Sequence, residues 1–204
     1  LPEEETTFPW SGHLGIRSHS SLLKILDQNK SILLFTNTRN QSERWYQCLR
    51  FFVPEMAEKI AIHHGSLEKE DRKRVEEGVK DGLIKWVVCT SSLDLGVDFQ
   101  PVDQIVQIGS AKNLARLIQR AGRSAHRPGG KSKIIFMPTN SLELLEISAM
   151  RRIIKSGISE KIRLPELSYD VLVQHLISLA CGNGFDPIIE KKRVKNCWSY
   201  RNLK

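Results

Sequence analysis

The chain has 204 residues, 40% of them hydrophobic, which is enough for one ordinary domain and a small second piece. Its net charge is +8, and residues 151–204 hold 11 Lys and Arg against 5 Asp and Glu. A basic segment attracts nucleic acid without reading its sequence, although a solvated surface is the commoner explanation. No run approaches the roughly 18 apolar residues of a membrane span, and the acidic start LPEEETTF is unlike a secretion signal.

The four cysteines lie far apart with no C-x-x-C pair, which argues against a zinc site and against a disulfide framework. We therefore expect a cytoplasmic protein with reduced thiols and no membrane partner. Because residue 1 is Leu rather than Met, we also expect the chain to be a piece of a longer protein.

Five short apolar runs bounded by turn residues predict β-strands. Their apolar residues are continuous rather than alternating, as in parallel strands that are buried on both faces. The runs are SILLFT (31–36), IAIHH (60–64), KWVVCT (85–90), QIVQIG (104–109) and KIIFMP (133–138). Residues 41–52 between them predict a helix with an apolar stripe, and the charged residues 67–81 predict a helix on the outside. The alternation of strands and helices indicates an α/β fold with a parallel sheet.

The pattern changes after Pro138. Residues 141–156 predict a helix, a polar connector follows, and DVLVQHLISLAC predicts an amphipathic helix that ends at Gly182. Its inward side would carry Leu172, Leu176, Leu179 and Ala180. We therefore predict one domain over residues 1–158 and the start of a second, mainly helical and incomplete domain over residues 159–204.

Polar residues follow the first three predicted strands. Ligands of open parallel sheets bind beyond the carboxyl ends of the strands, so these positions are candidates for binding. They are Thr36, Asn37 and Arg39, then His64 and Ser66, then Thr90 and Ser91. Each alone is typical of a helix cap. Together they suit a sugar-phosphate backbone, which hydroxyls, amides and helix N-termini contact without reading bases.

Four arginines recur at steps of four, three and four residues in a stretch without acidic residues. They are Arg116, Arg120, Arg123 and Arg127. In a continuous helix they would share one face, with Leu114, Leu117 and Ile118 on the other. Two interpretations stay open from the spacing: arginine fingers for a nucleotide on a neighbouring domain, or a surface helix neutralised by Asp94, Asp98 or Asp103.

Two apparent sites are decoys. The adjacent His63 and His64 would point to opposite faces of a strand, and no acidic or Cys ligand has chelating spacing, so we predict no metal site. The stretch Gly129-Gly130-Lys131-Ser132 ends like a phosphate loop, but Ala125 stands where that loop needs glycine. No complete phosphate loop and no acidic magnesium motif occur in the sequence.

The order TNTR, HHGS, VVCTSSLDLGVD and QRAGRSAHR resembles motifs IV, IVa, V and VI of the second RecA-like domain in superfamily 2 helicases. FPWSGHLGIR, HRPGG and DVLVQHLISLACGNGF resemble the large helicase-related (Lhr) group, in particular its ligase-associated DEXH-box relatives. The resemblance covers nearly the whole chain. It implies a RecA-like domain followed by the start of a winged helix.

The resemblance also implies roles for particular residues. Arg123 and Arg127 would face the γ-phosphate of ATP, although the usual pattern QRxGRxGR has its last arginine where this chain has His126. Gln119 and Arg120 would contact the first RecA-like domain, and Gly96 and Asp98 would lie near the ribose. Thr36, Asn37, Arg39, His64, Ser66, Thr90 and Ser91 would contact single-stranded DNA.

The parent protein would be an ATP-dependent DNA helicase or translocase, nucleoid-associated, with ATP and Mg²⁺ bound mainly by its first RecA-like domain. That domain, single-stranded DNA and DNA repair proteins such as a DNA ligase are the expected partners. The chain alone is expected to lack ATPase activity. Two alternatives remain open: remodelling of RNA or DNA–RNA hybrids on the same fold, and a non-catalytic nucleic-acid-binding module.

Overall fold

The computed structural model describes residues 15–94, 102–124, 132–157 and 164–204. Its internal contacts divide the chain into two compact units, Leu1–Ser159 and Glu160–Lys204, and each unit is described by itself. Within the described ranges, no helix combines the length and the apolar character that crossing a membrane requires.

The first unit is built on a five-stranded parallel sheet. The strands are β1 (Ile32–Phe35), β2 (Ile60–His63), β3 (Trp86–Cys89), β4 (Gln104–Ile108) and β5 (Ile134–Met137). Their order is β2-β3-β1-β4-β5, and Leu33 in the central strand pairs with Val87 on one side and Ile105 on the other. All five strands match the predicted runs, so the expected parallel α/β fold is confirmed.

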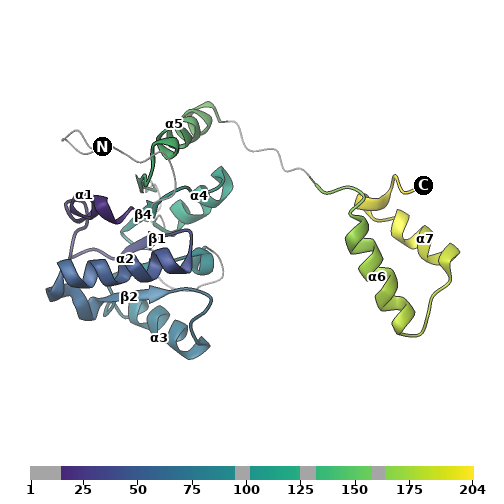
Figure 1. The fold of residues 1–204 in the computed structure, drawn as a ribbon, viewed down its shortest axis with the longest axis horizontal. Coiled ribbons are helices and arrows are strands. Elements are labelled where there is room, and N and C mark those ends of the chain that lie inside the picture. The colour runs from purple at the N-terminus through teal and green to yellow at the C-terminus, as the bar shows by residue number, and fades with distance from the viewer. Residues whose placement is uncertain (1–14, 95–101, 125–131, 158–163) are drawn as a thin grey trace. The chain divides into compact units, whose positions relative to one another are not determined.

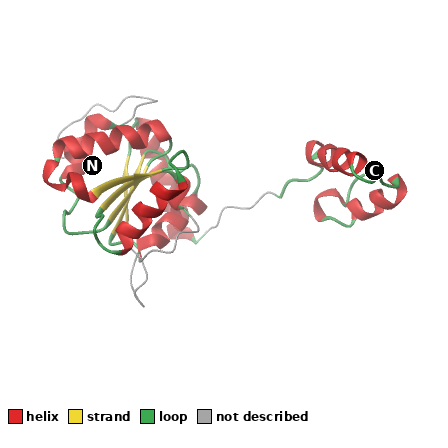
Figure 2. Ribbon diagram, turned by 90° about the horizontal axis from the view of Figure 1, so that it is seen from below, coloured by secondary structure: helices red, strands yellow, loops and turns green. Residues whose placement is uncertain are grey.

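Helices cover both faces of this sheet (Figures 1 and 2). Three of them are preceded by an N-cap residue whose side-chain oxygen accepts a hydrogen bond from a main-chain N–H of the first turn. These residues are Thr38, Asn113 and Asn140. The helices are α1 (His19–Leu23), α2 (Arg39–Phe52), α3 (Lys69–Lys80), α4 (Leu114–Ala121) and α5 (Ser141–Ser156). Short 3₁₀ turns lie at η1 (Ile16–Ser18), η2 (Pro54–Lys59), η3 (Ser91–Leu93) and η4 (Gly122–Ser124).

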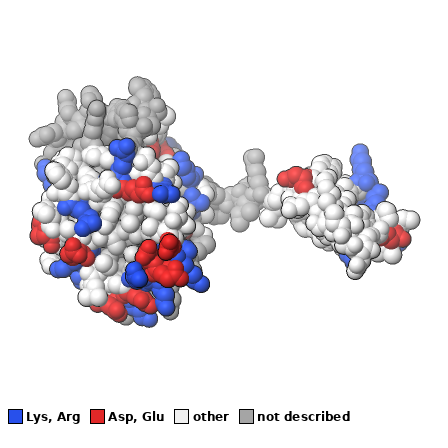
Figure 3. All heavy atoms as spheres, turned by 60° about the horizontal axis from the view of Figure 1, so that its bottom comes forward, with Lys and Arg blue, Asp and Glu red and all other residues white. Residues whose placement is uncertain are grey.

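The core lies on both faces of the sheet because successive strand residues point to opposite sides. On one face, Trp45 and Leu49 of α2 are fully buried against Trp86. On the other face, half-buried Val75 and Val79 of α3 pack against the sheet, and no residue of α3 is fully buried. The predicted outside position of this helix is confirmed. On the face of this unit that Figure 3 presents, basic and acidic side chains are interspersed.

The second unit contains α6 (Tyr169–Cys181), α7 (Pro187–Lys195) and η5 (Trp198–Tyr200). Gly182 is the C-terminal cap of α6, as predicted. Leu172, Leu176 and Leu179 are half-buried, whereas Ala180 is exposed and so does not join them. Leu172 and Leu176 line a small apolar hollow together with Phe185 and Val194. At the edge of that hollow, the buried carboxylate of Glu190 lies 2.9 Å from His175 Nε2.

Candidate functional site

The predicted row of arginines is not one helical face. α4 ends at Ala121, the 3₁₀ turn η4 follows, and Arg127 lies outside the described residues. The buried stripe of α4 consists of Leu114, Leu117 and Arg120, whereas Ile118, expected inside, is 56% exposed.

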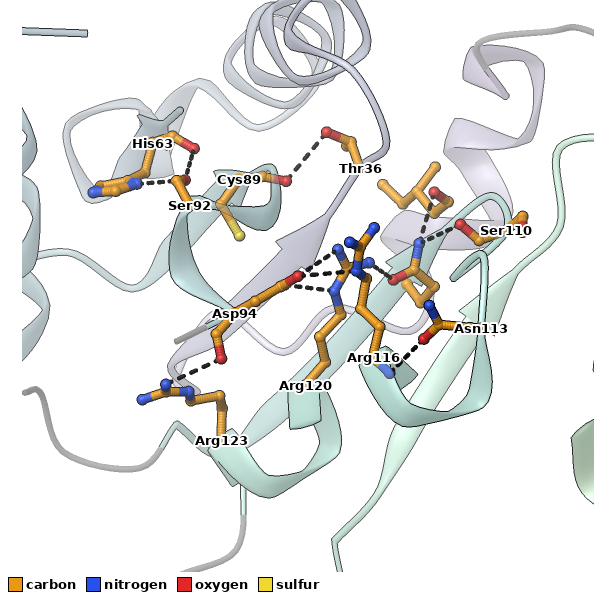
Figure 4. Close-up of polar contacts among 12 residues, drawn as sticks. Thr36, His63, Cys89, Ser92, Asp94, Ser110, Asn113, Arg116, Arg120 and Arg123 are labelled. Atoms are coloured by element: carbon orange, nitrogen blue, oxygen red, sulfur yellow. Dashed lines mark hydrogen bonds and ion pairs between the residues drawn. The ribbon is translucent and has the colours of Figure 1, made fainter. Parts of the chain in front are cut away.

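Asp94 is the centre of the arginine cluster (Figure 4). It directly follows η3, its side chain is 8% exposed, and its Oδ1 lies 2.7 Å from Arg120 Nε. Its Oδ2 lies 3.3 Å from Arg120 Nη2 and 3.4 Å from Arg116 Nε. For Arg116 and Arg120, the neutralising anion is therefore Asp94 of the same chain, one of the three acidic residues that the second interpretation named. Of the three predicted acidic neighbours, Asp103 instead accepts hydrogen bonds from Ser31, and Asp98 lies outside the described residues.

The rest of the Arg120 guanidinium is also enclosed. Its Nη1 donates to the Gln107 side-chain oxygen, and its Cζ lies 4.5 Å from the centre of the Phe35 ring. The side chain of Arg120 is 1% exposed. A contact with another domain, which the resemblance implied, does not fit this burial. Arg120 therefore forms a buried ion pair with Asp94 and connects α4 to β1 and β4.

Arg123 lies at the far end of the same cluster and is half-buried. Its Nη2 donates to the main-chain carbonyl of Asp94 at 3.1 Å, and its own carbonyl accepts from Val102 N at 3.1 Å. Because Val102 comes just before β4, Arg123 lies near the amino end of that strand. Gln119 lies on the outer side of α4, exposed beside Ile118.

The first polar position after β1 is not open to a ligand. Thr36 is 0% exposed, and its hydroxyl donates to the carbonyl of Cys89 at 3.1 Å, which ties β1 to β3. Its predicted contact with a nucleic-acid strand does not fit this burial. Asn37 is half-buried, and Arg39 is exposed, with its Nε 2.8 Å from Glu43 Oε1. Arg39 also lowers the pKa of that carboxyl group.

The two histidines after β2 are both buried. His63 is 1% exposed, and its ring lies 2.7 Å from Ser92 Oγ and 3.0 Å from Glu76 Oε1. His64 is 4% exposed, with its Nε2 3.6 Å from Glu43 Oε1. Burial lowers the pKa of both rings, so both favour the neutral form near neutral pH. The predicted strand contact through the His64 ring does not fit its burial.

Four of the positions predicted to bind single-stranded DNA lie at the same end of three adjacent β-strands. Asn37 follows β1, exposed Ser66 follows β2, and half-buried Thr90 and exposed Ser91 follow β3. Since the sheet order is β2-β3-β1, these positions form one edge with Arg39. Gly96, Asp98 and Arg127 lie outside the described residues.

The ends of β4 and β5 carry a polar arrangement that sequence reasoning missed. Glu143 is 8% exposed and accepts hydrogen bonds from Ser110 N at 2.9 Å and Thr139 N at 2.6 Å. The spacing of Asn140 and Glu143 before an apolar helix was the available signal, because it is a capping pattern. Gly109, which follows β4, lies close to Asn37 of the edge formed by the predicted DNA-binding residues. Its φ is 76°, and a Cβ there would lie 3.1 Å from Asn37 Nδ2.

Among the described residues, no group of three or more His, Cys, Asp and Glu side chains is arranged to hold a metal ion.

Two family models match the sequence. The helicase conserved C-terminal domain matches residues 18–129, and the winged helix domain of large helicase-related protein matches residues 151–204. The fold and these matches define the chain as a RecA-like helicase C-terminal domain followed by a winged-helix segment.

Similar proteins narrow this class. The ATP-dependent helicase Lhr-Core of Methanocaldococcus jannaschii is 34% identical over 99% of this chain and 24% of its own length. The Lhr helicase/uracil glycosylase of Escherichia coli is 33% identical over 69% of this chain and 9% of its own length. The Mycobacterium smegmatis helicase Lhr, solved bound to ssDNA and AMP-PNP, matches 100% of this chain and 29% of that one, with 26% identity and a TM-score of 0.82.

The chain belongs to the large helicase-related (Lhr) family of helicases, and the predicted resemblance to this group is confirmed. It spans about a quarter of the length of the Methanocaldococcus relative. The winged-helix match begins at residue 151, inside α5, whereas the division by contacts falls after Ser159. The boundary after residue 158 stays a prediction.

Proposed function

We propose that this chain is the second motor half of an ATP-dependent DNA helicase or translocase, and that Arg123 reaches the γ-phosphate of ATP bound mainly by the first RecA-like domain. The observation that carries the proposal is the anchoring of Arg123. Residues 94 and 102, on both sides of the segment with Gly96 and Asp98, are hydrogen-bonded to Arg123. The first bond orients the guanidinium and the second holds the main chain of Arg123, and a guanidinium oriented in advance can stabilise the charge that develops on a transferred phosphoryl group.

Other residues complete the nucleotide side of the proposal. Arg127 is the second candidate finger, Gly96 and Asp98 lie near the ribose, and Gln119 contacts the first RecA-like domain. The exposed position of Gln119 beside exposed Ile118 supports that contact, because a partly apolar helix face suits an interface between domains. ATP brings Mg²⁺, which the other domain holds in this proposal.

Single-stranded DNA lies along the edge formed by Asn37, Arg39, Ser66, Thr90 and Ser91. The support is the shared position of these residues after three adjacent strands and the ssDNA in the solved Mycobacterium structure. Hydroxyl, amide and guanidinium groups suit phosphate and sugar, so binding is independent of base sequence and falls with added salt. A role in DNA repair alongside proteins such as a DNA ligase rests on the family resemblance alone.

The test is single-turnover ATP hydrolysis by the full-length helicase that contains this chain, with saturating single-stranded DNA. Arg123→Ala is expected to lower the rate by about 10³-fold, the loss typical of an arginine finger. Arg74→Ala is the matched control, because Arg74 is an exposed arginine on α3 whose Nη1 lies 3.3 Å from Asp71 Oδ1. If Arg123→Ala hydrolyses ATP at the parental rate, Arg123 is not a finger.

The chain by itself is expected to hydrolyse no ATP and to bind single-stranded DNA weakly, with an affinity that falls steeply as salt is added. Salt-independent binding would contradict the proposed strand edge. An equal affinity for an RNA strand of the same sequence would favour the RNA-remodelling alternative.

A further inference from the structure

The carboxylate of Asp94 contacts Arg120, whereas the main-chain carbonyl of the same residue contacts Arg123. The carboxylate forms two contacts with the Arg120 guanidinium, at 2.7 Å and 3.3 Å, and the side chains involved are 8% and 1% exposed. An ion pair with two matched contacts in a buried site fixes orientation as well as distance. The main chain at residue 94 is therefore held against the last turn of α4.

The same residue holds Arg123 through a different atom. The main-chain carbonyl of Asp94 accepts the hydrogen bond from Arg123 Nη2, and Arg123 follows Arg120 by three residues across the end of α4. The side chain and the carbonyl of one residue thus act on two arginines. If the carboxylate releases Arg120, the carbonyl that orients Arg123 loses its support.

We propose that Asp94 is a positioning residue for ATP hydrolysis, which sets the orientation of Arg123 through its ion pair with Arg120. This inference rests on the proposed role of Arg123 as a finger. Misplacing a catalytic group by about 1 Å costs roughly 100-fold in rate. Since Asp94 acts on the geometry of hydrolysis and does not touch ATP, its loss lowers kcat and leaves KM for ATP nearly unchanged.

The test is steady-state ATP hydrolysis by the full-length helicase with saturating single-stranded DNA. Asp94→Asn keeps the side-chain shape but turns an NH₂ group toward guanidinium donors. It is expected to lower kcat by about 10- to 100-fold, with KM for ATP changed by less than about threefold. Asp94→Glu, which restores the charge, recovers part of kcat. Asp103→Asn is the matched control, because Asp103 contacts Ser31 rather than an arginine.

A second variant separates positioning from folding. Asp94→Leu with Arg120→Met removes both charges of the ion pair, so the group left without its donor is the neutral Gln107 oxygen, and replacing a whole buried ion pair by apolar residues often preserves stability. It is expected to keep the parental melting temperature within a few degrees and still to show the low kcat of Asp94→Asn.

Two outcomes overturn the inference. If the folded double variant hydrolyses ATP at the parental rate while Arg123→Ala is defective, Asp94 does not position Arg123 and the finger assignment survives. If Arg123→Ala is itself as active as the parent, the proposed function fails, and the inference fails with it.

Discussion

Replacing Arg120 by Met should destabilise the first unit strongly, even in the absence of any other domain. Arg120→Met leaves the Asp94 carboxylate, 8% exposed, with the Arg116 guanidinium at 3.4 Å, and leaves the Gln107 oxygen without the Arg120 donor. Removing one partner of a buried ion pair typically costs about 3–5 kcal/mol. Because Arg116 remains and is 40% exposed, the lower end is expected, about 3 kcal/mol.

The assay is urea unfolding of this chain followed by circular dichroism, with thermal melting alongside. For a unit of this size, about 3 kcal/mol corresponds to a melting temperature lower by roughly 6–12 °C. Arg120→Lys keeps the charge but loses the planar fork, so it should fall between the parent and Arg120→Met. Gln119→Met is the control on the exposed side of α4, with an expected effect within about 0.5 kcal/mol. A loss below about 1 kcal/mol for Arg120→Met would refute the structural role of this ion pair.

Three further outcomes are expected. Arg39→Ala should lower the slope of log affinity against log salt for single-stranded DNA by about 0.7, one phosphate contact, and an unchanged slope would remove Arg39 from the edge. Thr36→Val should cost about 1 kcal/mol, because the Cys89 carbonyl loses the hydroxyl donor and keeps the main-chain N–H of residue 36 at 2.8 Å, with DNA affinity unchanged; weaker binding by the folded variant would restore Thr36 as a contact. Burial lowers the pKa of His63, so the unfolded chain takes up its proton first, and the free energy of unfolding should fall as pH drops below about 6.5, until the lower folded pKa is reached. His63→Asn should reduce the difference in the free energy of unfolding between pH 7.5 and pH 5.5, measured by urea titration. An equal difference in the variant would show that His63 does not cause the pH dependence.

The sheet could be predicted because its strands are buried on both faces, and such strands appear in the sequence as continuous apolar runs. The fully buried β1 residues Ile32–Phe35 are the plainest case. The outside position of α3 was equally predictable, since a helix with charges around most of its circumference has few ways to be buried. In both cases the local pattern and the tertiary environment agree.

The interior of the arginine cluster could not be predicted from the pattern. Helical spacing places the arginines on one face and Ile118 with Leu114 and Leu117 on the other, whereas the structure buries Arg120 beside Leu117 and exposes Ile118. The reason is Asp94, 26 residues away, which the sequence offered only as one of three acidic neighbours, together with the Gln107 oxygen and the Phe35 ring, which local spacing does not specify. Thr36 is similar: its hydroxyl serves the Cys89 carbonyl, a use that depends on strand order.

The short turn η3 (Ser91–Leu93) connects residues of the two proposed sites. At one end, Ser91 belongs to the proposed strand edge, and the next residue, Ser92, lies 2.7 Å from the His63 ring. Two residues later, Asp94 carries the ion pair with Arg120 and the carbonyl that accepts from Arg123. Ser91 and Asp94 are therefore three positions apart in the chain, so the proposed DNA contact and the anchor of Arg123 share one short segment.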